Sequence, residues 1–300
     1  MRIALATAAD QVHTDQDDAP LLAALSAAGH EAALIAWDDP DVDWGHWDAV
    51  LVRTAWDYHH RRDDFVAWAQ QVESVTRLFN PAEVIRWNTH KSYLLELEER
   101  GAPLVPTAWL ARGDTVDLPT LARARGWEQV VLKPAVGAGG DGVHLVDPVS
   151  GQERLEGLLA SGDVLVQPFL ETIASSGELS VILFDGQISH AVRKRPGEGA
   201  FLVQIEHGGS YEPLDAVPGD AGELATWIVS VTGHDLLYSR VDLVPDAVGV
   251  WQLTELELAE PGLYMHLVPG SAERLVTAME ARLGSTASGT GSHRAGERSP

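Results

Sequence analysis

The sequence predicts an α/β protein that begins with an open, largely parallel sheet and continues into further subdomains. Strand and helix patterns alternate over roughly the first 80 residues, an order typical of a parallel sheet with crossover helices. Pro103 and Pro106 then form an extended connector, which marks a subdomain boundary. The length of 300 residues favours two or three such units.

In the first hundred residues we expect three strands and three helices. The helix at 20–29 has a proline near its start and a glycine at its end, the usual asymmetry of helix termini. The expected strands are 3–7, 31–37 and 49–53, and the other expected helices are 65–77 and 91–100.

The second part of the chain contains more strands. Between 107 and 167 we expect helices at 118–126 and 153–160 and strands at 129–133, 143–146 and 164–167. Two further helices and four long apolar strands follow, the strands at 179–184, 187–193, 237–243 and 252–258. Residues 285–300 have no apolar period and are expected to be disordered.

Composition narrows the functional classes. Apolar residues make up 45% and charged residues 22%, as in soluble proteins. No apolar run is long enough to cross a bilayer. We therefore expect a cytoplasmic protein without a membrane partner. The absence of cysteine excludes disulfides, thiolate zinc sites and cysteine nucleophiles. A net charge of −23 disfavours a nucleic-acid partner, although cations and Mg²⁺ in a cleft can still bind a nucleotide.

A glycine-rich loop follows the expected strand 129–133. Gly137, Gly139, Gly140 and Gly142 include a match to the dinucleotide-binding pattern G-x-G-x-x-G. That pattern needs a helix after the glycines, and here a strand follows, so a Rossmann site is disfavoured. A glycine hairpin can still offer backbone N–H groups to phosphate, with Lys133 beside it. The alternative is an ordinary flexible hairpin with a surface lysine.

Two later strands carry polar residues at a spacing of two. Arg240 and Asp242 share one face of their strand, as do Glu255 and Glu257. If the strands are neighbours, three carboxylates and one arginine converge, and oxygen ligands of this kind suit Mg²⁺. Arg240 could then stabilise a transferring phosphoryl group. The alternative is a solvated strand face, but like charges held together on long apolar strands favour a bound cation.

These features together resemble the ATP-grasp superfamily, nearest the branch of glutathione synthetase and RimK-type ligases. The resemblance runs from about residue 1 to 283 and rests on the order of its motifs. These are Asn-Thr-His-Lys at 88–91, the proline connector, the glycine loop, Gln-Pro-Phe-Leu at 167–170, Gly-Glu at 177–178, His-Gly-Gly at 207–209 and the acidic strands ending at Pro261. It implies an N-terminal α/β domain at 1–102, a central lid at 103–170 and a C-terminal subdomain at 171–284, the last two being α+β units that enclose ATP.

The resemblance also implies roles for nucleotide-binding residues. Lys91 and Lys133 would contact adenine and the α- and β-phosphates, and the glycine loop would be a flap over the phosphates. Glu178 would bind the ribose hydroxyls. A hinge would read adenine through backbone groups, and its residues are Gln167, Pro168, Phe169 and Leu170.

The same resemblance implies a reaction. Asp242, Glu255 and Glu257 would hold two Mg²⁺ ions, a substrate carboxylate would accept the γ-phosphoryl group, and a nitrogen nucleophile would displace phosphate from the acyl phosphate. Two departures from the family pattern stand out. Glu257 replaces the usual asparagine, and Leu202 replaces an arginine that normally faces the phosphate or substrate. We expect Arg193 or Lys194 to supply the charge that Leu202 lacks.

Arg53, Asp57 and Tyr58 follow an apolar strand at the sheet edge where open α/β sheets bind ligands. An arginine that grips a carboxylate and an aspartate that holds an ammonium would suit an amino-acid-like substrate. The alternative is a loop arginine paired with a nearby acid. The residues that follow the first strand, His13, Asp15, Asp17 and Asp18, could also reach the cleft, but an acidic solvated loop is the favoured interpretation.

In length and motif layout the chain is also similar to the cyclo-ligases of antibiotic biosynthesis that close D-cycloserine from O-ureido-D-serine. The alternatives are an intermolecular amide or dipeptide ligase, a nucleotide-binding module without chemistry, and the NAD-dependent oxidoreductase disfavoured above. A homo-oligomer is compatible with the sequence.

Overall fold

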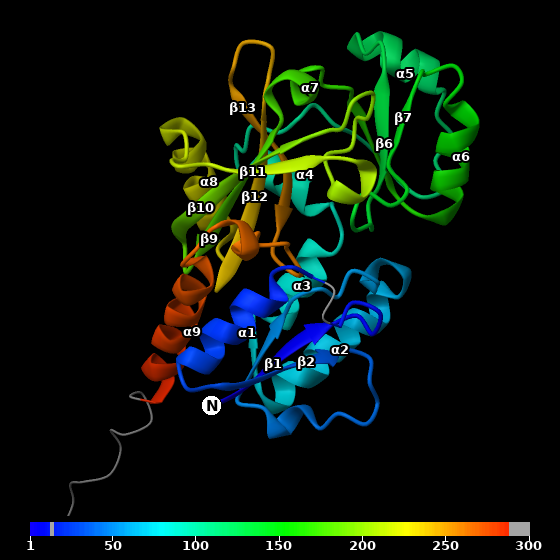
Figure 1. Cartoon of the computed structure of the whole chain (residues 1–300). Coiled ribbons are helices and arrows are strands. Elements are labelled where there is room, and N and C mark those ends of the chain that lie inside the picture. Colours follow the sequence, from blue (N-terminus) through cyan, green and yellow to red (C-terminus); the bar gives the residue numbers. More distant parts are fainter. Residues whose placement is uncertain (13–14, 288–300) are drawn as a thin grey trace, which may run out of the picture.

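The computed structural model describes residues 1–12 and 15–287 and contains three sheets (Figure 1). It confirms the α/β class. Each sheet lies within one of the ranges expected for the three units, and the division into units stays a prediction. Among the described residues no helix is both long and apolar enough to span a membrane.

The N-terminal sheet is parallel and has the order β2-β1-β3-β4. Its strands are β1 (Arg2–Thr7), β2 (Glu31–Ala36), β3 (Ala49–Val52) and β4 (Arg77–Phe79). The chain moves from β1 outward to β2 and returns to the other side at β3. This reversal leaves a crevice at the carboxyl ends of β1 and β3, where sheets of this kind bind ligands.

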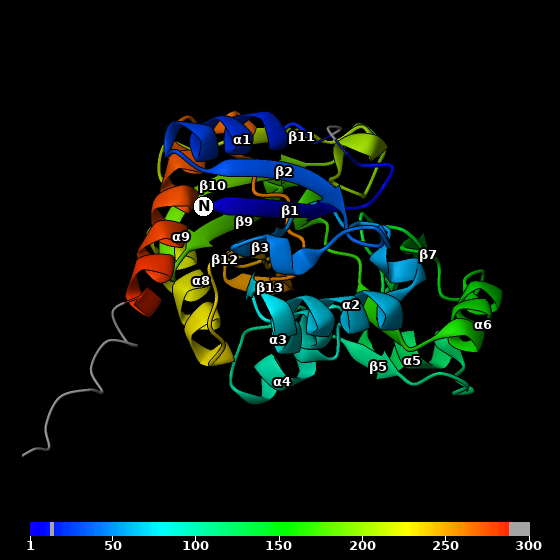
Figure 2. The ribbon, with the colours of Figure 1, turned by 90° about the horizontal axis from the view of Figure 1, so that it is seen from below.

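Helices cover both faces of this sheet (Figure 2). Because neighbouring side chains of a strand point to opposite faces, Ile3 and Leu5 pack beneath α1 (Asp18–Ala27), whereas Ala4 and Ala6 pack beneath α2 (Arg62–Val75). Helix α2 ends two residues before the expected end, because Thr76 is extended (φ −151°) and leads into β4. Its aromatic side chains Phe65 and Trp68, together with Trp37 and Trp44 from the connection between β2 and β3, fill this second core.

The central sheet is antiparallel, with the order β5-β8-β6-β7. Its strands are β5 (Ala108–Leu110), β6 (Val130–Pro134), β7 (His144–Val146) and β8 (Val164–Pro168), and helices α5 (Leu118–Arg125) and α6 (Gln152–Ser161) pack against it. Strands β6 and β7 pair directly as a hairpin around the glycine loop. No helix opens at the glycines, so the dinucleotide-binding alternative is excluded.

The C-terminal sheet is also antiparallel, in the order β11-β10-β9-β12-β13. Its strands are β9 (Glu178–Phe184), β10 (Gln187–Arg195), β11 (Ser210–Pro213), β12 (Tyr238–Pro245) and β13 (Trp251–Glu257). Helix α8 (Gly219–Thr232) covers one face. The short helix α7 (Thr172–Ser176) and 3₁₀ turns at Trp44–His46, Tyr58–His60, Ile205–His207 and Met265–Leu267 complete the elements.

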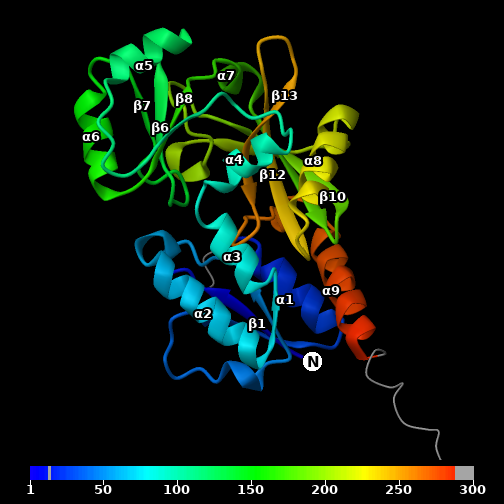
Figure 3. The same cartoon turned by 180° about the vertical axis from the view of Figure 1, so that it is seen from behind.

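The last helix, α9 (Ser271–Ala287), joins the C-terminal sheet to the N-terminal domain (Figures 1 and 3). Leu275, Val276 and Met279 pack in one core with Leu21 and Leu25 of α1. Helix α9 ends at Ala287, so it includes the first three residues, 285–287, of the segment expected to be disordered. The rest of that segment, 288–300, lies outside the described residues.

A connector formed by α3 (Ala82–Asn88) and α4 (Tyr93–Glu99) links the first sheet to the others. The side chains of Tyr93, Leu94 and Leu97 are buried in the core of the C-terminal sheet together with Leu104. The expected boundary at residue 102 therefore falls inside a packed region.

Candidate active site

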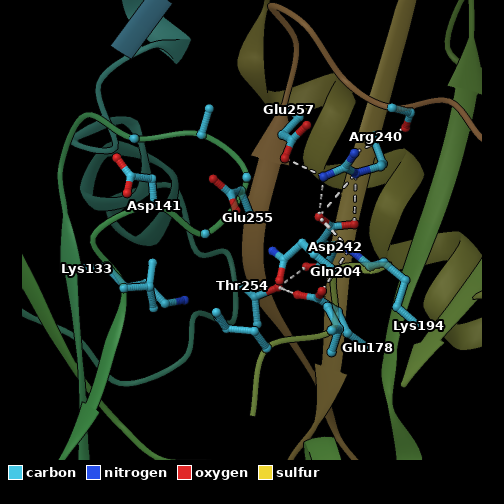
Figure 4. Close-up of a pocket in the computed structure, with 18 of the residues that line it drawn as sticks. Lys133, Asp141, Glu178, Lys194, Gln204, Arg240, Asp242, Thr254, Glu255 and Glu257 are labelled. Atoms are coloured by element: carbon cyan, nitrogen blue, oxygen red, sulfur yellow. Dashed lines mark hydrogen bonds and ion pairs between the residues drawn. The ribbon is translucent and has the colours of Figure 1, made fainter. Parts of the chain in front are cut away.

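A cavity of about 580 Å³ lies where the three sheets meet. Its lining comes from the loops after β1 and β3, from the glycine hairpin and hinge of the central sheet, and from the polar face of the C-terminal sheet. Figure 4 shows its acidic centre on β12 and β13 and Lys133 approaching from the opposite wall. Every sheet contributes residues, so the cavity depends on the complete fold.

The predicted acidic patch is present in this cavity. Strands β12 and β13 are antiparallel neighbours, with Arg240 opposite Glu257 and Asp242 opposite Glu255. The three carboxylates each offer an oxygen, and these oxygens lie within 4.8 Å of one another. The structure thus confirms the convergence expected from the spacing of two residues.

A β-bulge changes this register immediately beside the patch. Asp242 pairs with Glu255 but Leu243 pairs with Leu253, so Thr254 is an extra residue on β13. As a result Thr254 and Glu255, although adjacent in sequence, both line the cavity. The Thr254 hydroxyl lies 2.7 Å from Glu178 Oε1 and 2.9 Å from the Asp242 carbonyl oxygen. The bulge therefore connects the acidic patch to Glu178.

Asp242 is buried and held by several donors. Ser180 Oγ donates to its Oδ1 at 2.5 Å, Arg240 Nε donates at 3.2 Å, and Lys194 Nζ lies 3.3 Å from its Oδ2. Burial opposes ionisation, but the charges of Arg240 and Lys194 outweigh it and lower the pKa of Asp242 to about 2. This group is a fixed carboxylate at neutral pH.

The other two acids of the patch differ, because the charge of Lys91 outweighs burial and lowers the pKa of Glu255, whereas the pKa of Glu257 is raised. Lys91 Nζ is 2.9 Å from Glu255 Oε1, and Arg240 forms an ion pair with Glu257. Burial, with the charges of Glu255 and Asp242, nevertheless raises the pKa of Glu257 to about 8 despite Arg240. Burial likewise raises the pKa of nearby Glu260 to about 7. Such a group of hard oxygen donors fits a divalent cation.

All the lysines of this sequence, Lys91, Lys133 and Lys194, line the cavity. Lys91 also donates to the Gly137 carbonyl at 3.1 Å, and Lys194 lies 2.8 Å from Glu178 Oε2. Lys133 differs, because its side-chain ammonium forms no hydrogen bond or ion pair with any residue that the structure describes. Burial lowers its pKa despite the nearby carboxylates. An inward ammonium without a partner calls for an anionic ligand.

The glycine loop covers the cavity as a tight hairpin. Gly139, Gly140 and Gly142 have positive φ angles of 60°, 83° and 69°, which residues with a Cβ rarely adopt. The Tyr58 hydroxyl donates to the Gly137 carbonyl at 3.3 Å. The N-terminal domain therefore contacts the loop through Tyr58, which lines the cavity together with the loop.

The four hinge residues, 167–170, also line the cavity. Two of their polar groups are already used within the protein. The Phe169 N–H donates to the Gln129 carbonyl at 3.0 Å, and Gln167 Nε2 donates to Thr107 at 2.9 Å. Leu202 lines the cavity as well, beside Gly140.

Three expected site residues do not line the cavity. Arg193 points away, because it alternates on β10 with Lys194, and only Lys194 faces inward. Asp57 accepts from Trp37 Nε1 at 2.8 Å and from Arg61 at 2.7 Å, so it is not an ammonium site. Arg53 is 1% exposed and lies behind the lining, where Nη2 donates to the Pro261 carbonyl at 3.1 Å.

The structure adds lining residues that the sequence did not single out, among them Trp56, Tyr264 and His266. It also corrects the interpretation of the loop after β1. Asp17 and Asp18 are 2% and 4% exposed, and Asp15 and Asp17 line the cavity, so this segment is not a solvated acidic loop. Only the position after the first strand could have indicated this, since the carboxyl ends of parallel strands meet at one edge.

Comparison with known proteins agrees with this architecture. A family model described as the N-terminal domain of D-cycloserine synthetase DcsG matches residues 3–80. The chain is similar to the cycloserine biosynthesis protein DcsG of Streptomyces lavendulae, with 32% identity over 304 residues, 94% of this chain and 98% of that protein. The crystal structure of D-cycloserine synthetase DcsG superposes with a TM-score of 0.85 at 31% identity, covering 94% and 100% of the two chains. D-alanine–D-alanine ligase from Bacillus anthracis shares the fold, with a TM-score of 0.67 at 14% identity over 97% of this chain and 100% of that one.

Proposed function

Since this chain belongs to the DcsG family of ATP-grasp ligases and is therefore an ATP-dependent ligase, we propose that it closes the ring of D-cycloserine from O-ureido-D-serine. The likeness to DcsG over nearly the whole of both chains carries this proposal, because it includes the substrate end of the cavity. Glutathione synthetase of Prochlorococcus marinus matches only 42% of this chain. A small amino-acid-like substrate also suits a cavity of about 580 Å³ that must hold ATP as well.

For the nucleotide, we propose that the unpaired ammonium of Lys133 and the glycine loop bind phosphates, while Lys91 keeps Glu255 and the loop in place. The hinge residues would take the adenine and Glu178 the ribose. Asp242, Glu255 and Glu257, whose oxygens are of the type that Mg²⁺ prefers and lie within 4.8 Å of one another, would hold Mg²⁺, and the bound metal would neutralise charge on the phosphates. Arg240, fixed by Asp242 and by the Gly262 carbonyl at 3.1 Å, would face the transferring group.

The reaction that this arrangement supports has two bond-forming steps. A carboxylate oxygen of the substrate attacks the γ-phosphorus and ADP leaves, which gives an acyl phosphate. The ureido nitrogen bonded to oxygen then attacks the acyl carbon, loses its proton and displaces phosphate. Because D-cycloserine lacks the carbamoyl group of the substrate, one hydrolysis accompanies ring closure and releases that group as carbon dioxide and ammonia.

The direct test supplies the protein with Mg²⁺, ATP and O-ureido-D-serine as the sole amino substrate. We expect phosphate release together with D-cycloserine, identified by mass spectrometry. An absence of phosphate release would exclude ring closure of this substrate. Phosphate release that required a second amino acid would instead indicate an intermolecular amide ligase.

Replacement of Lys133 by alanine tests the nucleotide assignment. Because its ammonium has no partner among the described residues, its loss should leave the fold unchanged and raise the KM for ATP about 10- to 100-fold, the value of a charge-assisted contact. Arg123→Ala on the outer helix α5 is the control and should leave this KM unchanged. An unaltered KM in the Lys133 variant would contradict the assignment.

Metal binding should also be coupled to proton release. At pH 7 Glu257, with a pKa raised to about 8, holds a proton that Mg²⁺ must displace. The apparent Mg²⁺ affinity should therefore increase as the pH rises from 6 toward 8. Calorimetry in buffers of different ionisation enthalpy should show a release of roughly one proton for each binding event near pH 7. A heat that is independent of the buffer would contradict this.

A further inference from the structure

The substrate end of the cavity lies at the point where the N-terminal sheet reverses its strand order. Asp15 and Asp17 come from the loop after β1, and Trp56 comes from the loop after β3. The strands β1 and β3 are adjacent, so both loops reach the same crevice. The opposite side of this region is formed by Gly262, Tyr264 and His266 of the segment after β13.

Asp17 is a structural carboxylate in this region. Its Oδ2 accepts the Leu263 N–H at 3.0 Å, and its Oδ1 accepts the N–H and Nδ1–H of His266 at 2.9 and 2.7 Å. Burial opposes its ionisation, but the hydrogen bond from His266 and the charge of Arg53 lower its pKa. Asp17 therefore ties the β1 loop to the segment after β13, and both of its oxygens already accept hydrogen bonds within the protein.

Asp15 is different, because half of its carboxylate has no partner. Oδ1 accepts the Asp17 N–H at 3.2 Å, whereas Oδ2 is buried and has no hydrogen-bond partner among the described residues. A buried oxygen left in this state costs free energy unless a ligand donates to it. Burial and the adjacent charge of Asp17 raise the pKa of Asp15 although Arg53 lies nearby. The fixed cations of the protein thus leave this carboxylate incompletely neutralised.

No side chain that the structure describes donates to Asp15 Oδ2. Trp56 Nε1 donates to the Glu260 carbonyl at 3.2 Å, and Arg53 uses Nη2 on the Pro261 carbonyl, while its buried Nη1 has no partner among the described residues. Because Asp15 lines the cavity, a ligand there can supply the missing donor. A cationic group of the ligand satisfies both the hydrogen bond and the charge.

We propose that Asp15 binds the α-ammonium group of the amino-acid substrate and determines the selectivity of the enzyme for an amino acid over its deamino analogue. This assignment rests on the proposed function, because it places the substrate carboxylate toward Arg240 and Glu257 and the ammonium at Asp15, and all three residues line the same cavity. Two charged groups held at two positions fix the orientation of the substrate backbone. Asp57, the residue expected for this role from the sequence, is occupied by Trp37 and Arg61.

The test compares O-ureido-D-serine with its deamino analogue, 3-(carbamoylaminooxy)propanoate, titrated calorimetrically into the full chain with Mg²⁺ and a non-hydrolysable ATP analogue. The variant is Asp15→Asn, whose remaining oxygen can keep the Asp17 N–H bond. The matched control is Asp10→Asn, the same chemical change at an exposed position of the same loop. The wild type and the control should prefer the amine by about 10- to 100-fold, the value of one charge-assisted hydrogen bond.

In Asp15→Asn we expect this preference to fall to a factor of about 3 or less, while the KM for ATP and the melting temperature stay at the wild-type values. A preference that persists in the variant overturns the assignment, as does an equal rise in the KM values for ATP and for substrate. The ring-closure proposal is judged separately by phosphate release from the wild type.

If O-ureido-D-serine is not turned over, D-serine and 3-hydroxypropanoate replace the first pair of ligands. A preference for D-serine that depends on Asp15 would then support the ammonium site, even though the ring-closure proposal had failed. A wild type that shows no preference for the amine in either pair overturns the ammonium site.

Discussion

Replacement of Glu255 by glutamine should reduce kcat by about 100- to 10,000-fold, the range seen when one electrostatic element of a phosphoryl-transfer site is removed. Glutamine has nearly the same volume, so the strand pairing with Asp242 should persist. The change removes the charge that pairs with Lys91 at 2.9 Å and one of three converging carboxylates. The affinity for Mg²⁺ should fall, and Lys91 should lose the ion pair that holds its position.

Steady-state kinetics with varied Mg²⁺ and a thermal melt would test this expectation. Glu212→Gln is the matched control, because Glu212 is an exposed glutamate on β11 of the same sheet. The control should keep its rate, and both variants should melt near the wild-type temperature. A Glu255 variant with a near-normal rate would show that the acidic patch is not the metal site.

Replacement of Asn80 by alanine should lower the free energy of unfolding by about 3–5 kcal/mol, since three buried backbone groups lose their partner. Asn80 Nδ2 donates to the carbonyls of Tyr238 and Leu258 at 2.8 and 2.7 Å, and its Oδ1 accepts the Leu237 N–H at 2.8 Å. The residue also has a φ of 56°, which alanine tolerates poorly. It joins the end of β4 to β12 and to the residue after β13.

Urea unfolding measures this loss as a lower midpoint at an unchanged slope. Asn80→Gly separates the two contributions, because glycine accepts the positive φ but makes none of the three hydrogen bonds. We expect the glycine variant to recover about 1 kcal/mol relative to alanine. A loss below about 1 kcal/mol in both variants would mean that the two sheets are held together by other contacts.

The local patterns of this sequence determined much of its structure. The three parallel strands of the first 53 residues, the glycine hairpin between β6 and β7, and the long strands of the third sheet follow from alternation and from glycine and proline positions. The spacing of two placed Arg240 with Asp242 and Glu255 with Glu257, each pair on one face of its strand, and the pairing of the two strands in the structure brings the pairs together. The short elements α3, β4 and β5 were not predicted, because they are too short to show a period and β4 and β5 form by pairing with β3 and β8.

The roles of the N-terminal residues were decided only by the tertiary structure. Arg53 and Asp57 lie four residues apart, but one is buried behind the cavity wall and the other pairs with Arg61 on its outer side. Asp15 belonged to a segment that composition alone describes as a solvated acidic loop. It lines the cavity because β1 and β3 are neighbours, and strand order is not encoded in local periodicity.

The acidic patch was likewise predicted in part from local patterns and completed only by the tertiary structure. Its three carboxylates were identified from a spacing of two residues, which reports the face of a strand. The partners of these carboxylates were not identified from the sequence, because they depend on pairing between distant segments. This pairing produces the bulge at Thr254 and the contacts of Lys91 and Lys194. The sequence therefore determined which residues form the acidic face of each strand, and the tertiary structure decided which cationic side chains that face meets.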